Sequence, residues 1–274
     1  MANKITDNPL GHIVIERKVR RYVEDMYRTH SHFFNELFFL NSGARRQFIN
    51  NNIYDVLPGD LIIIPKGILH KTTSIDNSGF DRYCVYFDDN VIARLKAHIG
   101  DAPFDSFFNS ECLVLPESDA KIIKQKLDFM HAEKGVNDMY SPAICENLLC
   151  DIILCAMRNG TKKALKSGSD IGQIQQAIKY INANLAENIT LKDVASVLHM
   201  EETYFSKKFK QLTGLGFKEF LIQTRIKKAE ELLAYTDFGI AQISEKCGFA
   251  SSNYFGDAFK RINGMSPRQY RKLF

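Results

Sequence analysis

Residues 204–214 read YFSKKFKQLTG, and residues 254–264 read YFGDAFKRING. Both stretches follow the pattern Y-F-x3-F-K-x3-G. Upstream of them, LKDVASVLHM from Leu191 matches IAQISEKCGF from Ile240. The sequence therefore contains an internal repeat, and the second copy has one extra residue between its two matching parts.

The first copy predicts two helices joined by a tight turn. Thr190 is expected to cap a short helix, which is followed by a turn at His199–Met200 and a second helix from about Glu201. In that second helix, apolar residues at i, i+4 and i+7 predict a buried face. These inward residues are Phe205, Phe209 and Leu212. The opposite face presents polar and basic side chains, namely Thr203, Ser206, Lys207 and Lys210.

The second copy predicts the same arrangement. Ile240 and Ile243 are expected to face inward, and Gly248 to form the turn. The buried residues of the second helix are expected to be Phe255, Phe259 and Ile262. Its outward face comprises Ser252, Asn253, Gly256, Asp257 and Lys260.

Two helices joined by a tight turn, with small polar and basic residues on the second, are typical of a helix-turn-helix motif. Hydroxyl and amide groups read base edges in the major groove, and lysines neutralise phosphates. The stretch KEFLIQTRIKKAEELLAYT between the copies predicts a long helix that holds the two readers about one turn of DNA apart, roughly 34 Å. Residues 171–274 carry 15 Lys/Arg against 10 Asp/Glu, a balance that a polyanionic partner and a solvated surface explain equally well when it is taken alone. Together with the two copies and the connecting helix, it favours a DNA-binding domain over a plain helical bundle.

The last hundred or so residues also resemble the DNA-binding domain of AraC/XylS-type bacterial transcription regulators. The similarity is carried by LKDVASVLHMEETYFSKKFKQLTGLGFKEFL, TRIKKAEELL and ISEKCGFASSNYFGDAFKRINGMSPRQYRK. The resemblance implies bipartite binding, with each recognition helix in one of two adjacent major grooves. By position it implies base-facing roles for Thr203, Ser206, Lys207, Ser252, Asn253, Tyr254 and Asp257. Asp257 departs from the basic or polar residue common there; an aspartate accepts from cytosine N4 but repels phosphate.

The N-terminal half has a different period. Residues 11–90 contain short runs rich in Ile, Val, Phe and Tyr, separated by turn sequences such as NSG, LPGD and PKG, and predict a sandwich or small barrel. After Pro116, a helical apolar stripe comprises Ile122, Ile123, Leu127 and Met130. A second helix, SPAICENLLCDIILCAMRNG, is apolar over much of its circumference, which predicts that it packs in a core or against a partner subunit. We expect the helices at 116–159 to mediate dimerisation.

A set of histidines suggests a polar site within the predicted barrel. Residues 30–43, HSHFFNELFFLNSG, and residues 59–70, GDLIIIPKGILH, resemble the two motifs of the cupin β-barrel, H-x-H-x3-E-x6-G and G-x5-P-x-G-x2-H. The resemblance implies that His30, His32, Glu36 and His70 ligate a divalent ion, as in metal-binding cupins. On one strand, positions 30, 32 and 36 would share a face. Imidazoles with one carboxylate suit iron, manganese, nickel or zinc.

Three interpretations of this site stay open: an effector pocket without a metal, an effector pocket that holds a metal, and metal-dependent catalysis. Regulators of this family commonly carry an N-terminal cupin-like domain that binds a small effector, often a sugar. Strand parity adds Phe34, Phe38 and Leu40 to the lining, and aromatic faces beside His and Glu suit a sugar. The predicted effector-binding residues are His30, His32, Phe34, Glu36, Phe38 and His70.

The sequence thus predicts an α+β multidomain protein with a cupin-like β-barrel, a helical dimerisation segment and a C-terminal all-α domain. The expected boundaries are 1–160 for the effector-binding and dimerisation domain, 161–170 for the polar linker, and 171–274 for the DNA-binding domain. No apolar run reaches the roughly 18 residues of a membrane span, and the six cysteines form no CxxC pair, which favours the cytoplasm. Expected partners are promoter DNA, a sugar-like effector, RNA polymerase and a second copy. The predicted function is a regulator, most simply an activator, without catalytic residues. The alternatives are a metal-dependent cupin enzyme, a metal-responsive regulator, or activation through protein contacts alone.

Overall fold

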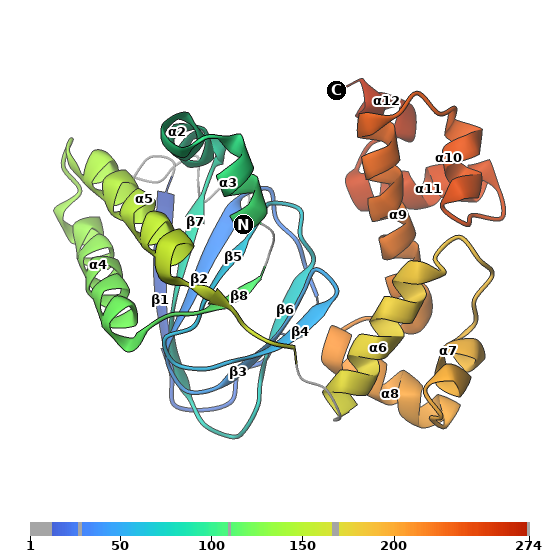
Figure 1. Ribbon diagram of the computed structural model, residues 1–274, viewed down its shortest axis with the longest axis horizontal. Coiled ribbons are helices and arrows are strands. Elements are labelled where there is room, and N and C mark those ends of the chain that lie inside the picture. Colours follow the sequence, from blue (N-terminus) through green and yellow to red (C-terminus); the bar gives the residue numbers. More distant parts are fainter. Residues whose placement is uncertain (1–12, 27–28, 109–110, 166–169, 273–274) are drawn as a thin grey trace. The chain divides into compact units, whose positions relative to one another are not determined.

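The computed structural model describes residues 13–26, 29–108, 111–165 and 170–272 (Figure 1). It divides into two compact units, Met1–Leu165 and Lys166–Phe274. Among the described residues, every helix is too short or too polar to cross a membrane.

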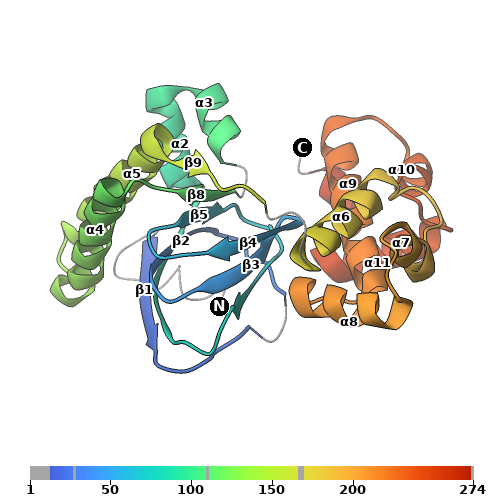
Figure 2. The same cartoon turned by 60° about the horizontal axis from the view of Figure 1, so that its bottom comes forward.

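The first unit is built on two antiparallel sheets. Its strands are β1 (Ile13–Arg20), β2 (Asn35–Ser42), β3 (Arg45–Ile49), β4 (Asn52–Val56), β5 (Leu61–Ile64), β6 (His70–Ser74), β7 (Phe80–Phe87), β8 (Cys112–Val114) and β9 (Thr161–Lys162). One sheet has the order β1-β7-β2-β5-β8-β9, and the other has the order β4-β3-β6 (Figure 2). The predicted cupin-like β-rich fold is confirmed.

Alternation along β2 separates two apolar layers, because successive strand residues point to opposite faces. Phe38 and Leu40 pack with side chains of both sheets, in the interior between them. Leu37 and Phe39 point to the other face of the larger sheet, where helices cover them. The barrel interior is thus lined by one parity of each strand.

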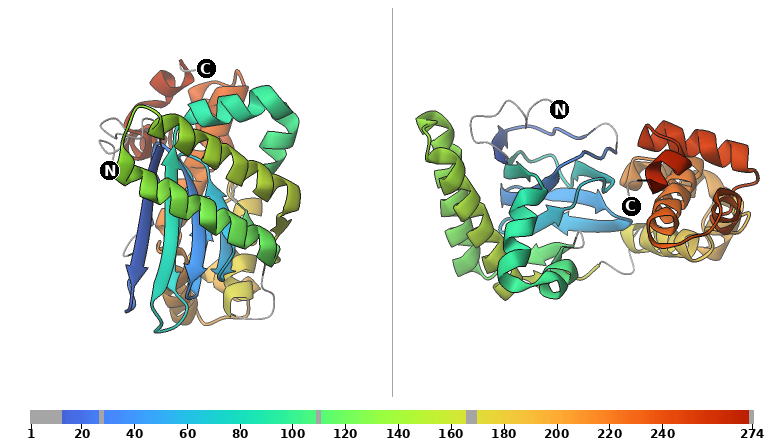
Figure 3. Two further views of the ribbon diagram at one scale, coloured as in Figure 1. Left: turned by 90° about the vertical axis from the view of Figure 1, so that its left-hand side faces the viewer. Right: turned by 90° about the horizontal axis from the view of Figure 1, so that it is seen from above.

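The described residues of this unit form four helices: α2 (Asp89–Ile99), α3 (Asp101–Phe107), α4 (Glu117–Val136) and α5 (Ser141–Asn159). In Figure 3, α4 and α5 lie side by side across the outer face of the larger sheet. On α4 the buried residues Ile123, Leu127 and Met130 follow a helical spacing. The predicted inward position of Ile122 is wrong: its side chain is 45% exposed, because it lies about 100° around the helix from Ile123.

The start of the predicted linker belongs to the sheet. Thr161 pairs with Val114 and Lys162 with Leu113, so the expected linker boundary at 161 is two residues too early. Residues 166–169 of the predicted linker lie outside the described residues. The division between the two units falls between Leu165 and Lys166.

The second unit is helical throughout its described part. Its helices are α6 (Asp170–Ala183), α7 (Leu191–Val197), α8 (Glu202–Thr213), α9 (Phe217–Tyr235), α10 (Ile240–Lys246), α11 (Ser252–Asn263) and α12 (Pro267–Arg271). The repeat forms the pairs α7–α8 and α10–α11, and α9 runs between them (Figure 1). Thr190 caps α7 with its side chain, as predicted.

One predicted core residue of the repeat is exposed. Leu212 of α8 is buried, but its counterpart Ile262 of α11 is 40% exposed. The helix that follows each motif differs in length. The helix after α8 is α9, which packs against it and has 19 residues, whereas the helix after α11 is α12, which packs against it and has five residues. We attribute the exposure of Ile262 to this shorter cover, which sequence spacing alone does not reveal.

Candidate functional site

The predicted histidine site is assembled from three separate segments. His30 forms an isolated bridge with His70, closed by two backbone hydrogen bonds of 3.0 and 2.9 Å. His32 lies in irregular chain after that bridge, and Glu36 lies in β2. The prediction that residues 30, 32 and 36 share one strand is therefore wrong. The side chains nevertheless meet, because the bridge brings residue 70 beside residue 30.

The convergence is close enough for one small ligand. One nitrogen of each of His30, His32 and His70 lies within 4.8 Å of the other two. The carboxylate of Glu36 has its Oε2 atom 3.0 Å from Nε2 of His32 and 3.7 Å from Nε2 of His70. The thiol of Cys84 donates to the second carboxylate oxygen at 3.2 Å. All four predicted ligands thus lie together.

Backbone contacts fix the tautomers of two histidines. Nδ1 of His32 donates to the carbonyl oxygen of Phe34 at 2.8 Å, and Nδ1 of His70 donates to that of Ile68 at 2.9 Å. The Nε2 lone pairs of neutral His32 and His70 then face the Glu36 carboxylate. Two nitrogen lone pairs and a carboxylate that face one another can hold a cation between them. Histidines held through Nδ1 in this way are typical of metal ligands, so the residues fit a divalent ion.

The electrostatics of this cluster follow from burial. Burial would raise the pKa of Glu36, but the hydrogen bond with His32 and the nearby His70 and Arg82 outweigh it and lower the pKa to about 2. Burial and the adjacent imidazole of His70 lower the pKa of His30 to about 4. Burial also lowers the pKa of His70. The cluster therefore combines an anionic carboxylate with the imidazole of His30, which is neutral at pH 7.

The predicted aromatic lining is only partly beside the histidines. The ring of Phe34 stacks on His32 at a centroid distance of 4.1 Å. Phe38 and Leu40 are fully buried in the apolar layer between the sheets. Phe38 lies 5.5 Å from the guanidinium of Arg82, so it contacts a part of the interior that the sequence reading did not include.

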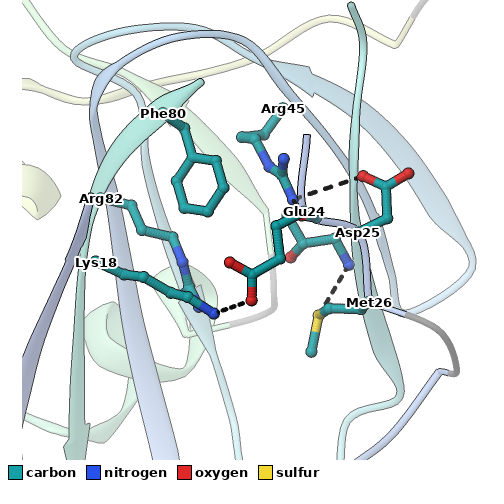
Figure 4. Close-up of a pocket in the computed structure, with 8 residues that line it drawn as sticks. Lys18, Glu24, Asp25, Met26, Arg45, Phe80 and Arg82 are labelled. Carbon is teal, nitrogen blue, oxygen red and sulfur yellow. Dashed lines mark hydrogen bonds and ion pairs between the residues drawn. The ribbon is translucent and has the colours of Figure 1, made fainter. Parts of the chain in front are cut away.

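That part is a pocket between β1, β3, β6 and β7, closed on one side by residues 24–26. Figure 4 shows Phe80, Arg82 and Lys18 along one flank, and Arg45 and Asp25 on the other. The sequence reading missed these residues. Strand parity could have identified them. Arg45 and Gln47 share one face of β3 with Ile49, and Arg82 shares one face of β7 with Phe80 and Cys84. Polar residues at inward positions of a strand indicate a lined interior.

On the second unit, the predicted DNA-contacting residues lie on the outer faces of α8 and α11. Ser206 is half-buried and the others are exposed: Thr203, Lys207, Lys210, Ser252, Asn253, Tyr254, Asp257 and Lys260. Phe205 and Phe209, and likewise Phe255 and Phe259, anchor the opposite faces in the core. Each helix thus presents one polar face that a major groove can accept.

Arg225 contacts both helix-turn-helix halves of this unit. Arg225 of α9 donates from Nε to the carbonyl oxygen of Leu185 and from Nη2 to that of Glu187, both at 2.8 Å. Its guanidinium lies 5.9 Å from the ring of Phe249, which follows the turn of the second motif. The arginine therefore joins the loop after α6 to the α10–α11 turn.

A β-rich unit with a polar interior is followed in this chain by a unit with two helix-turn-helix motifs. This combination defines a transcription regulator that carries a ligand-binding domain and a DNA-binding domain in one chain. Two family models match: the AraC-like ligand binding domain over residues 12–135, and a helix-turn-helix domain over residues 194–273. The chain belongs to the AraC family of transcription regulators, which confirms the predicted family.

Several named proteins are similar to this chain. The transcriptional activator RhaR of Mannheimia succiniciproducens is 26% identical over 259 residues, which span 93% of this chain and 91% of the relative. The regulatory protein PocR of Salmonella typhimurium is 36% identical over 100 residues, 36% of this chain and 33% of PocR. The C-terminal domain of AraT, a response regulator from Geobacillus stearothermophilus, is 36% identical to this chain. That match covers 37% of this chain and 85% of the domain, with a TM-score of 0.36.

Proposed function

We propose that this chain is a cytoplasmic transcription activator whose binding to promoter DNA responds to a small polar effector in the barrel interior. The observation that carries the proposal is the pair of exposed polar faces on α8 and α11, each backed by buried phenylalanines on the same helix. The likeness to RhaR, a transcriptional activator, supports the sign of regulation. In this proposal the chain acts on RNA polymerase bound nearby and catalyses no reaction.

A salt titration of DNA binding tests the regulator proposal. Fluorescence anisotropy of the purified chain with labelled promoter fragments should show a preferred sequence and an affinity that falls with salt, by about 0.9 in log–log slope per neutralised phosphate. Random DNA of equal length is the control. Equal affinity for every sequence together with no salt dependence would exclude the proposal.

The outer surface of α4 supports a homodimer. Ile122, Phe129 and Val136 recur every seven residues, and their side chains are 45%, 54% and 59% exposed. Apolar residues in a heptad on an exposed helix face are typical of helix–helix association. We propose that this α4 stripe pairs two copies. Sedimentation of Phe129→Glu should give a monomer at concentrations where the parent is a dimer, while Lys121→Glu, at an exposed polar position of the same helix, should leave the dimer intact.

A second candidate is a metal-responsive regulator, favoured by the Nε2 atoms that converge on Glu36. The ion would be held by His30, His32, Glu36 and His70, and it would supply the positive charge between them. Metal analysis of the purified chain should find one divalent ion, lost in the double variant His30→Ala/His70→Ala and kept in His98→Ala, which alters an exposed histidine of α2. Parent protein that stays free of metal after exposure to iron, manganese, nickel and zinc would exclude the metal-responsive candidate.

A further inference from the structure

The arginine pocket, defined here by Lys18, Glu24, Asp25, Arg45, Phe80 and Arg82, has a volume of about 140 Å³. It lies in the same interior as the histidine cluster, because Arg82 donates to Cys84 and Cys84 donates to Glu36. The proposed effector site therefore has a second polar end.

Arg45 forms the inner wall of this pocket and has unused hydrogen-bonding capacity. Its side chain is 3% exposed, and its guanidinium lies 4.3 Å from the ring of Phe80. Nη1 donates to Ser74 Oγ at 2.6 Å, and Nη2 donates to the carbonyl oxygen of Glu24 at 2.7 Å. Both of these acceptors are neutral, and Nε has no hydrogen-bond partner. A buried guanidinium with an unpaired N–H costs free energy unless an anion reaches it.

Arg82 adds a second cation on the opposite flank. It is half-buried, and its guanidinium lies over the ring of Phe38 as well as beside the thiol of Cys84. Burial would lower the pKa of Arg82, but the Cys84 thiol and the carboxylates of Glu36 and Glu16 outweigh it and raise the pKa. Arg45 of β3 and Arg82 of β7 thus both line the pocket.

Gln47 supplies the third observation. It is fully buried, and neither its amide nitrogen nor its amide oxygen has a hydrogen-bond partner. It lies two residues beyond Arg45 on β3, so both side chains point into the interior. Its register partner on β6 is Thr72, which lines the pocket. An unpaired buried amide costs about 1–3 kcal/mol, and a ligand hydroxyl in the interior would satisfy it.

The acidic residues of the pocket lie at its rim. Glu24 pairs with Lys18 and Arg20, and the side chain of Asp25 is 45% exposed and 3.9 Å from Arg45. Figure 4 shows the Glu24 carboxylate directed toward Lys18. The Glu24 carboxylate is therefore neutralised at the rim by Lys18 and Arg20, whereas Asp25 forms a long ion pair with Arg45 of the inner wall.

We propose that the arginine pocket binds the carboxylate or phosphate group of a small hydroxylated organic anion, with Arg45 and Arg82 as its charge partners and Gln47 as a hydroxyl partner. The planar guanidinium matches both groups through paired N–H donors. A neutral sugar would bring no negative charge to the unpaired Nε–H of Arg45. This inference rests on the proposed function, because it names the chemical class of the effector.

The test compares each acid with its neutral counterpart, using thermal shift of the full chain. The pairs are galacturonate with galactose, gluconate with glucose, and glucose 6-phosphate with glucose; acetate and inorganic phosphate report on the charged group alone. A saturating organic anion should raise the melting temperature by about 5–10 °C, and its neutral partner should not. A response to the sugar acids identifies a carboxylate ligand, and a response to glucose 6-phosphate identifies a phosphate ligand.

Variants assign the response to the pocket. Arg82→Gln and Gln47→Leu should weaken binding of the responding anion about 10- to 100-fold. Arg46→Gln is the matched control, because Arg46 is the next residue on β3 and pairs with Asp55 at 2.7 Å instead. Gln47→Leu removes two unpaired atoms, so it should fold even where Arg45→Gln, which loses the Ser74 contact, does not.

Three results would overturn the inference: no anion stabilises the chain, a neutral sugar stabilises it as well as its acid, or both pocket variants bind like Arg46→Gln. DNA binding is measured on the same preparations. Loss of sequence preference would count against the regulator proposal, and it would leave the anion-binding result standing by itself.

Discussion

The two helix-turn-helix motifs use the same backbone turn with different residues. His199 in the first turn has φ 53°, and Gly248 at the matching position in the second has φ 75°. His199 N donates to Ser196 O, and Gly248 N donates to Glu245 O, the same three-residue span. Only the second turn is crowded: a Cβ on Gly248 would lie 2.6 Å from Leu185 O and 2.7 Å from Ala186 O. The repeat fixes the conformation, and the surroundings of each copy select the residue.

The recognition helices also differ at their first turns. The carboxylate of Glu201 accepts from two backbone N–H groups of α8, whereas the neutral hydroxyl of Ser251 caps α11. The outer face of α8 carries Lys207 and Lys210, whereas that of α11 carries an aspartate, Asp257, beside its lysine. We infer that the first copy contributes phosphate contacts from its lysines, and the second contributes base reading.

The largest expected effect comes from crowding the second turn. Gly248→Ala should lower the free energy of unfolding of the C-terminal unit by about 2–4 kcal/mol, from the positive φ and the clash with two carbonyl oxygens. Calorimetry of the full chain resolves this transition from that of the barrel. Gly256→Ala is the control: its Cβ meets nothing within 4 Å, so stability should rise by up to about 1 kcal/mol. Equal losses in both variants would contradict the comparison.

The next largest effect is expected at Arg225, which contacts both motifs. Arg225→Met should weaken binding to a complete two-groove site by about 1.5–3 kcal/mol, because the loop after α6 loses two charge-assisted hydrogen bonds. Binding to a half-site that only α11 reads should stay unchanged, since the contact faces of the helix are intact. A comparable loss on both DNAs would mean that Arg225 stabilises the fold without positioning the readers.

The inferred division of labour predicts two different kinds of loss. Lys207→Ala should lower affinity for all sequences and reduce the salt slope by about 0.9, as for one phosphate contact. Asn253→Ala should cost about 1–2 kcal/mol on the preferred sequence alone and leave the slope unchanged. Anisotropy titrations on preferred and scrambled DNA separate the two, and an exchange of these signatures would reverse the assignment.

The smallest effect is expected at the first turn. His199→Gly should raise the free energy of unfolding by about 0.5–1 kcal/mol, because glycine adopts positive φ without a Cβ penalty and the position is exposed. Chemical denaturation with urea measures the change. A destabilised His199→Gly would show that the imidazole contributes more than the turn geometry indicates.

Much of the C-terminal unit was predictable because its signals are local. Helical spacing placed Phe205, Phe209, Phe255 and Phe259 in the core, and a capping residue marked the start of α7. The prediction that Ile262 is buried was wrong, and we attribute its exposure to the short helix α12 that follows it. In the barrel, residue types identified the histidine cluster correctly, but the assumed single strand was wrong. The bridge between His30 and His70 joins residues forty apart, and no local pattern encodes it.

The sequence by itself determined the duplicated reader, the β-rich first unit and the four residues of the histidine cluster. Hydrophobic periodicity, motif spacing and turn residues are properties of neighbouring positions, so they can be recognised in the sequence alone. Only the tertiary structure decided that Arg45, Gln47 and Arg82 share one interior, and that Gly248 packs against the loop after α6. Such contacts between residues far apart in the sequence depend on strand order and register, which are set by the packing of the whole sheet.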